Sequence, residues 1–240
     1  MLQPLSRRVL HAAYNLVAIG ATITIGAAAI AAQAPHTSRA GTAPAKSAAD
    51  STYLTRLAVV QAGDTTVDLA ALRRQFASTT FYAPYDIHVG ERKARMWARL
   101  DAQDVAGAGA IADSLLAANY LDADAHVGAG VSARARGDSL AAARHFAVAR
   151  CIMRSMESTG DGRTKDRPLF VLSPAEEYSY LGAVGLKRVG SQGLDVCTDG
   201  RACDRLEVAP RDGGEKFDLF FDISLPMAHM TRQFKHANKP

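Results

Sequence analysis

Apolar residues recur at helical spacing between Glu91 and Met156, and this pattern constrains the fold more than any other feature of the chain. Spacings of three and four residues place apolar side chains along one side of a helix, so the region predicts helices that bury one face. Gly137 and Asp138 interrupt the pattern and predict a turn between two helices. The helix after this turn carries a wide apolar sector, so we expect both of its sides to be covered.

The two helices around this turn resemble a tetratricopeptide hairpin, and we expect Asp124 to cap the first of them. Small and packing residues stand where that repeat places them, namely Gly130, Ala142, Phe146 and Ala149. Roughly 34 residues earlier, a weaker match predicts a second, degraded hairpin, carried by Asp104, Ala108 and Ala112. Two hairpins are fewer than a free-standing solenoid needs, so we expect the C-terminal part of the chain to cover them.

The pattern changes after Gly160. Ser173, Pro174 and Glu176 predict a helix start, with a capping box and a proline at the first helical position. Strand-like stretches separated by turn signals then follow, over residues 186–189, 193–197, 204–208 and 217–223. Pro226 starts a last predicted helix. The predicted fold class is therefore α+β, with tetratricopeptide-like helical hairpins packed on a small antiparallel sheet.

The N-terminal segment predicts export. Arg7 and Arg8 precede an uncharged run over residues 16–32 that ends in small residues, as signal peptides do. We predict a signal peptide over residues 1–32 with cleavage after Ala31 or Ala32, and an uncleaved N-terminal anchor is the alternative. The expected location is the periplasm or the extracellular space. The pair of arginines leaves the general and the twin-arginine routes both open.

The remaining chain divides into three predicted segments. Residues 33–52 are rich in Ala, Pro, Thr and Ser without periodicity, which predicts a flexible linker. Residues 53–158 carry the helical hairpins, and residues 159–240 carry the small sheet with its helices. We expect the last two segments to pack as one unit.

Three cysteines occur in the chain. Cys197 and Cys203 bracket a turn sequence, and outside the cytoplasm a disulfide between them is expected. Cys151 stands among apolar residues and is expected in the core. Two cysteines alone do not make a structural zinc site, so we expect no metal here.

The charge and the motifs exclude several functional classes. The net charge of +4 falls to about +2 when Arg7 and Arg8 are subtracted with the leader, which is too small and dispersed to predict nucleic-acid binding. No Lys/Arg block follows the leader, so an electrostatic attachment to a membrane is unsupported. We also expect no membrane insertion beyond the leader. Metalloprotease, nucleophile-elbow and phosphate-loop motifs are absent from the sequence, and we expect no cofactor.

Five short motifs follow one another in the chain, over residues 68–73, 82–85, 158–162, 176–178 and 217–224. In this order they resemble domain-of-unknown-function family 4919, which contains secreted bacterial proteins without an assigned activity. The resemblance is most specific at Gly160-Asp161-Gly162 and at Glu176-Glu177-Tyr178, and it covers about residues 67–234. It implies export and a shared fold, and it brings no mechanism. The pair of Cys197 and Cys203 is a local addition to the family pattern.

Residues 160–166 form the most polar stretch after the leader. In a structural interpretation, Gly160 ends the preceding helix in a left-handed cap. In a functional interpretation the stretch is a ligand loop, whose backbone N–H groups approach an anion beside Asp161, Arg163 and Lys165.

Glu177 and His126 are the supporting polar candidates. We expect Glu177 to form an ion pair with Arg163 or Lys165. If His126 and Glu177 instead converge with Asp161, the three side chains predict a hydrolase with a polar site where the helical and sheet parts join. Whether the chain is an enzyme stays open at this point.

Aromatic residues provide the last candidate site. Tyr82, Tyr85 and Trp97, together with Phe81, form an aromatic cluster in the sequence. The cluster predicts either a lid on the helical core or a surface for a peptide, since helical hairpins commonly present a binding face. The favoured function is a protein or peptide interaction module of the cell envelope, with an envelope protein or peptide as its partner.

Overall fold

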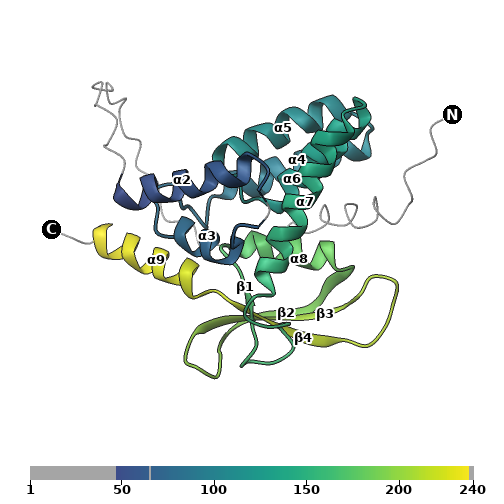
Figure 1. The fold of residues 1–240 in the computed structure, drawn as a ribbon. Coiled ribbons are helices and arrows are strands. Elements are labelled where there is room, and N and C mark those ends of the chain that lie inside the picture. Colours follow the sequence, from purple (N-terminus) through teal and green to yellow (C-terminus); the bar gives the residue numbers. More distant parts are fainter. Residues whose placement is uncertain (1–46, 65, 238–240) are drawn as a thin grey trace, which may run out of the picture.

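The computed structural model describes residues 47–64 and 66–237, and within them the chain folds into helices and one four-stranded sheet (Figure 1). The helical part comprises α2 (Ala48–Gln61), α3 (Leu69–Phe76), α4 (Ile87–Asp101), α5 (Val105–Ala118), α6 (Ala123–Ala135) and α7 (Ser139–Met156). The C-terminal part comprises β1 (Leu169–Phe170), α8 (Pro174–Ala183), β2 (Leu186–Val196), β3 (Ala202–Pro210), β4 (Phe217–Asp222) and α9 (Ser224–Ala237). The predicted α+β class is confirmed.

Helices α4 to α7 pack as two successive hairpins, each helix against the next. Asp104 and Asp138 cap α5 and α7 in the same way, each accepting a hydrogen bond from the backbone N–H three residues later. Gly130 must be small, because a Cβ atom there would lie 2.8 Å from the Phe146 ring. Helix α6 is capped by Asp122 and not by the predicted Asp124, whose side chain is occupied by Lys93.

The sheet has the strand order β1-β4-β3-β2. Strands β2, β3 and β4 are antiparallel neighbours, but β1 runs parallel to β4, so the sheet is mixed and not purely antiparallel as predicted. The two stretches predicted on either side of Gly190 belong to one strand, because a bulge between Arg188 and Gln192 absorbs the irregular residues. Helix α8 lies between the sheet and the helical hairpins (Figure 1).

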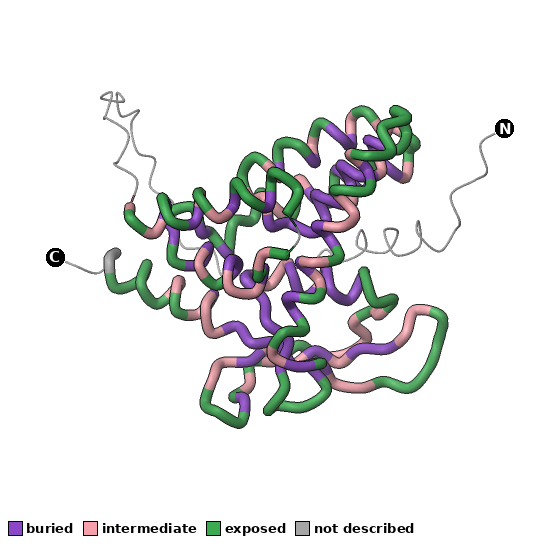
Figure 2. The backbone as a smooth tube through the Cα atoms, in the orientation of Figure 1, coloured by how far each residue is buried: buried purple, intermediate pink, exposed green. Residues whose placement is uncertain are grey.

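One apolar core joins the helical part to the sheet. It includes Leu72 and Ile152 from the helices and Leu206 and Phe221 from the strands, all with no exposed surface. A second core lies inside the hairpins around Met96, where α4, α5 and α6 meet. Figure 2 shows the buried segments gathered where the helices meet the sheet.

Helix α2 includes residues that the sequence analysis assigned to a flexible linker. Residues 48–52, predicted as linker, form the first turn of α2, because Ser47 and Asp50 form a reciprocal capping box. Asp50 is buried and also accepts a hydrogen bond from the Thr80 backbone, which fixes this helix to the rest of the fold. The predicted signal peptide over residues 1–32 and the first part of the predicted linker lie outside the described residues.

The predicted disulfide is present between Cys197 and Cys203, and both residues are buried. It closes the turn between β2 and β3, where Gly200 adopts a φ of +82°. Cys151 is a free, half-buried cysteine that packs against the main core. Among the described helices, none combines the length and the apolar character that a membrane span requires.

Candidate functional site

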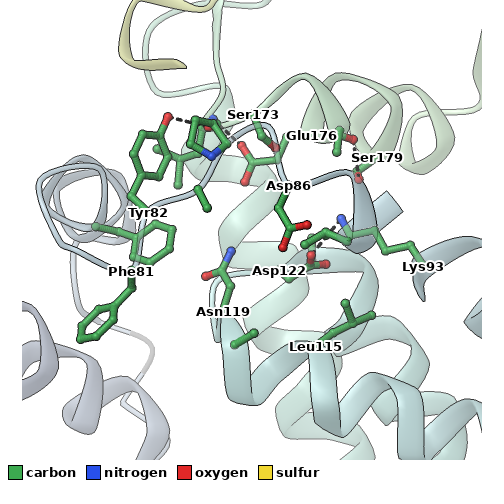
Figure 3. Close-up of a pocket in the computed structure, with 18 of the residues that line it drawn as sticks. Phe81, Tyr82, Asp86, Lys93, Leu115, Asn119, Asp122, Ser173, Glu176 and Ser179 are labelled. Carbon is green, nitrogen blue, oxygen red and sulfur yellow. Dashed lines mark hydrogen bonds and ion pairs between the residues drawn. The ribbon is translucent and has the colours of Figure 1, made fainter. Parts of the chain in front are cut away.

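A cavity of about 120 Å³ lies beneath the segment that connects α3 to α4 (Figure 3). Its apolar walls include Phe76, Phe81, Tyr82, Leu115, Met156 and Leu172. Its polar walls include Asp86, Lys93, Asn119, Asp122, Ser173, Glu176 and Ser179. The cavity is therefore lined by residues of the helical hairpins on one side and of α8 on the other.

Three helices begin at this cavity. Asp86 caps α4 by accepting a hydrogen bond from the His88 backbone at 2.9 Å, and Asp122 caps α6 by accepting one from the Ala125 backbone at 3.0 Å. Helix α8 begins without a side-chain cap, because Ser173 makes no capping hydrogen bond. Helix N-termini carry partial positive charge, which favours carboxylates at these positions.

Glu176 does not complete the predicted capping box. Its Oε2 accepts a hydrogen bond from the Leu172 backbone at 2.7 Å and pairs with Arg73 Nη2 at 2.5 Å. The Arg73 side chain has no exposed surface, donates from Nη1 to Ser155 Oγ at 2.7 Å, and stacks on the Phe170 ring. Burial lowers the pKa of Arg73, and the Glu176 carboxylate opposes that shift. This ion pair connects α3, α7 and α8 at the wall of the cavity.

A second buried ionic network lies on the opposite wall. Lys93 Nζ contacts Asp122 Oδ2 at 2.9 Å and Asp124 Oδ2 at 3.0 Å, and Ser179 also donates to Asp124 at 2.6 Å. Burial alone would lower the pKa of Lys93, but the two carboxylates outweigh it and the net shift is upward. The network therefore holds α4, α6 and α8 together with one positive charge facing two negative ones.

The groups left for a ligand are few. Asp86 makes no ion pair within the described residues, and its carboxylate points into the cavity in Figure 3. Asn119 Oδ1 accepts a hydrogen bond from the Leu121 backbone, which leaves its amide nitrogen as a donor. Phe81 keeps 42% of its surface exposed at the mouth. This combination of an acceptor, a donor and an apolar surface suits binding.

Glu177, the next residue along α8, lies elsewhere. It has no exposed surface, and its Oε2 lies 3.5 Å from Gln192 Nε2, which also donates to Asp204 Oδ2 at 3.1 Å. Burial, followed by the charge of Asp204 and a hydrogen bond to it, raises the pKa of Glu177 well above its ordinary value. The Glu177 carboxyl group thus lies buried near the Asp204 carboxyl group, and burial and this like charge both favour its protonated form.

The ion pair predicted for Glu177 does not form among the described residues. Lys165 instead pairs with Asp195 at 2.8 Å, and the Arg163 guanidinium stacks on the Phe217 ring at 3.6 Å. Local sequence did not indicate Asp204 as the neighbour of Glu177, because Asp204 comes from strand β3 and its position depends on the strand register.

The predicted ligand loop packs against the sheet. Gly162, and not Gly160, has the positive φ, of +73°, and its backbone N–H donates to the Arg167 carbonyl at 2.8 Å. Gly160 is required for a different reason, because a Cβ atom there would collide with the Arg167 backbone. Asp161 accepts a hydrogen bond from the Arg163 backbone, and Lys165 and Arg163 have the partners given above. The side chains of the loop therefore make contacts within the protein itself.

His126 is buried and pairs with His145. His126 Nε2 lies 2.8 Å from the Tyr120 carbonyl, which only accepts, so this nitrogen carries the proton. Its Nδ1 then accepts from His145 Nδ1 at 3.0 Å. Burial lowers the pKa of His126 to about 4 and lowers that of His145 as well. No hydrogen bond or ion pair within the described part of the chain joins His126 to Asp161 or to Glu177.

This pair predicts a loss of stability in acid. Unfolded His126 takes up a proton near pH 6.5 and folded His126 only near pH 4, so stability falls as the pH decreases through this window. Between pH 7 and pH 4.5 the expected loss from this group is about 2 kcal/mol. Glu177 has the opposite effect on stability: its pKa is raised on folding, so its contribution to stability increases as the pH decreases. The pH dependence of the wild-type protein alone therefore does not isolate the contribution of His126. The measurement is therefore the difference between wild type and His126→Gln in denaturant unfolding at the two pH values. Equal changes in both proteins would contradict the prediction.

The predicted aromatic surface is wrong for two of its members. Tyr82 is buried, and its hydroxyl donates to the Leu172 carbonyl at 2.7 Å. Trp97 is buried in the second core, away from the cluster that contains Tyr82. Tyr85 is exposed, as is Phe81 of the same predicted cluster, whereas the burial of Tyr82 and Trp97 fits the alternative of a lid on the core.

Neither metal ligands nor known relatives add information about this site. Within the described residues, no group of three or more His, Cys, Asp or Glu side chains is placed to hold a metal ion. Neither a scan against protein-family models nor searches of curated proteins and of solved structures found a match to this chain. The resemblance to domain-of-unknown-function family 4919 therefore stays a prediction.

Proposed function

We propose that this chain is an exported interaction module that binds a peptide segment of an envelope protein in the cavity beneath residues 81–86. The observation that carries this proposal is the exposed apolar rim beside a concave, partly polar cavity. Phe81 lines the cavity and exposes 42% of its surface, and Tyr85 and Ile87, which follow it within seven residues of the chain, expose 42% and 73%. Exposed apolar groups gathered beside a cavity are characteristic of binding sites.

The size and chemistry of the cavity favour a peptide. A cavity of about 120 Å³ is smaller than the sites that enclose whole cofactors, and it suits one side chain of a larger partner. The amide donor of Asn119 suits a carbonyl group of a peptide backbone, and the free carboxylate oxygen of Asp86 can accept a hydrogen bond from a donor group of the peptide. Export is part of the same proposal, and the disulfide supports it because such bonds persist in oxidising compartments.

A hydrolase is the second candidate function. The nearby Glu177 and Asp204 carboxyl groups favour it, because a buried carboxyl group with a raised pKa beside a second one is a common acid–base arrangement. Glu177 has no exposed surface, however, so a substrate has no direct access to its carboxyl group. For this reason binding ranks first.

The test is a selection from a displayed library of random seven-residue peptides on immobilised residues 33–240. We expect specific peptides to be enriched, and we expect Phe81→Ala to weaken their binding at least tenfold, as loss of an aromatic anchor does. The matched control is Phe234→Ala, which removes an exposed phenylalanine from α9 outside the cavity lining. Enrichment of no peptide, or equal binding to Phe81→Ala, would contradict the proposed function.

A further inference from the structure

We propose that the cavity selects a basic side chain, lysine or arginine, of the bound peptide. This inference rests on the proposed function and adds the chemical class of the residue that is recognised. It starts from the charges around the cavity and from the shape of its apolar wall.

The charges that face the cavity are not fully paired. Arg73 and Glu176 compensate each other, but Lys93 supplies one positive charge to Asp122 and Asp124 together. Asp86 adds a further carboxylate without an ion pair among the described residues. The remaining basic group in the lining is Arg92, which lies half-buried. These three basic and four acidic side chains together leave one net negative charge around the cavity.

Helix N-termini oppose this charge only partly. The charge at a helix end is only about half an elementary charge, and its effect falls off within the first turn. A hydrogen-bonded ion pair joins two full charges, and the bound peptide would shield it from water although Asp86 is exposed in the free protein. Asp86 uses Oδ1 to cap α4, so Oδ2 is left for such a bond. Contact with Asp86 therefore outweighs the helix ends and favours a cation.

An acidic side chain is the alternative that the same cavity disfavours. Ser173 and the start of α8 would be its natural contacts, because the Ser173 hydroxyl makes no capping bond. The Glu176 carboxylate already lies at this helix end and accepts the Leu172 backbone N–H. A ligand carboxylate would meet it with like charge.

The apolar wall completes the match. Figure 3 shows Phe81 and Tyr82 on one side of the cavity and Asp86, Asp122 and Lys93 on the other. Lysine and arginine combine an apolar stem with a charged head, so the stem packs on the rings while the head meets Asp86. The exposed Phe81 ring adds a favourable contact with the cation.

The experiment begins with the peptides enriched by the wild-type protein. We expect lysine or arginine at one common position. In an N-acetylated synthetic peptide, which lacks a free terminal amine, replacing that residue with norleucine should weaken binding about tenfold or more. Asp86→Asn should remove most of this difference, because asparagine still caps α4 but carries no charge. Asp138→Asn, which alters the exposed cap of α7, should leave it unchanged.

The outcomes separate the two proposals. Enriched peptides without a common basic residue, or with an acidic one, would overturn the basic specificity and leave peptide binding intact. Equal affinity of the lysine and norleucine peptides would do the same. Enrichment of no peptide would overturn both proposals together.

Discussion

Replacing Arg73 with methionine is expected to lower the free energy of unfolding by about 3–5 kcal/mol, because it leaves the Glu176 carboxylate without its cation in the core. The Arg73 side chain has no exposed surface and holds Glu176 at 2.5 Å, so water cannot replace the lost partner without opening the join of α3 and α8. Urea unfolding, followed by circular dichroism, measures the change.

The neighbouring arginine supplies the control. Arg74 is exposed and also stacks on Phe170, so Arg74→Met should cost less than about 1 kcal/mol. The double variant Arg73→Met/Glu176→Met should be more stable than Arg73→Met alone, because no unpaired buried charge remains. A cost for Arg73→Met no larger than that for Arg74→Met would show that the pair does not hold the fold together.

Replacing Lys93 with methionine is expected to cost a similar amount, about 3–5 kcal/mol, because two buried carboxylates lose their shared cation. Adding Asp124→Asn should restore part of the loss, since it removes one of the two charges. Arg95→Met, an exposed position on the same helix, is the control. An unchanged unfolding midpoint for Lys93→Met would contradict the account of this network.

The elements with a regular pattern could be predicted from the sequence, and the contacts between distant elements could not. The hairpin turn at Gly137 and the disulfide followed from local spacing. Arg73 and Glu176 are 103 residues apart, so only the packing of α3 against the C-terminal part brings them together. Asp204 reaches Glu177 through the register of β3, which local sequence does not specify.

Some signals were present in the sequence and gave no prediction. Ser47 and Asp50 match the spacing of a capping box, which would have placed the start of α2 correctly. Asp86 stands two residues after Pro84 and directly before the apolar Ile87, a pattern that indicates a helix cap and would have placed a carboxylate beside Phe81. The burial of Tyr82 had no such signal, because a tyrosine in a turn sequence is compatible with either environment.

The most direct test of the binding site is a nuclear magnetic resonance titration of isotope-labelled residues 33–240 with the most enriched peptide. We expect the largest changes in amide resonances at residues 81–86, 119–123 and 172–176, which surround the cavity. Changes confined to the outer edge of β2, with these three segments unaffected, would contradict the claim that the cavity is where this protein binds its partner.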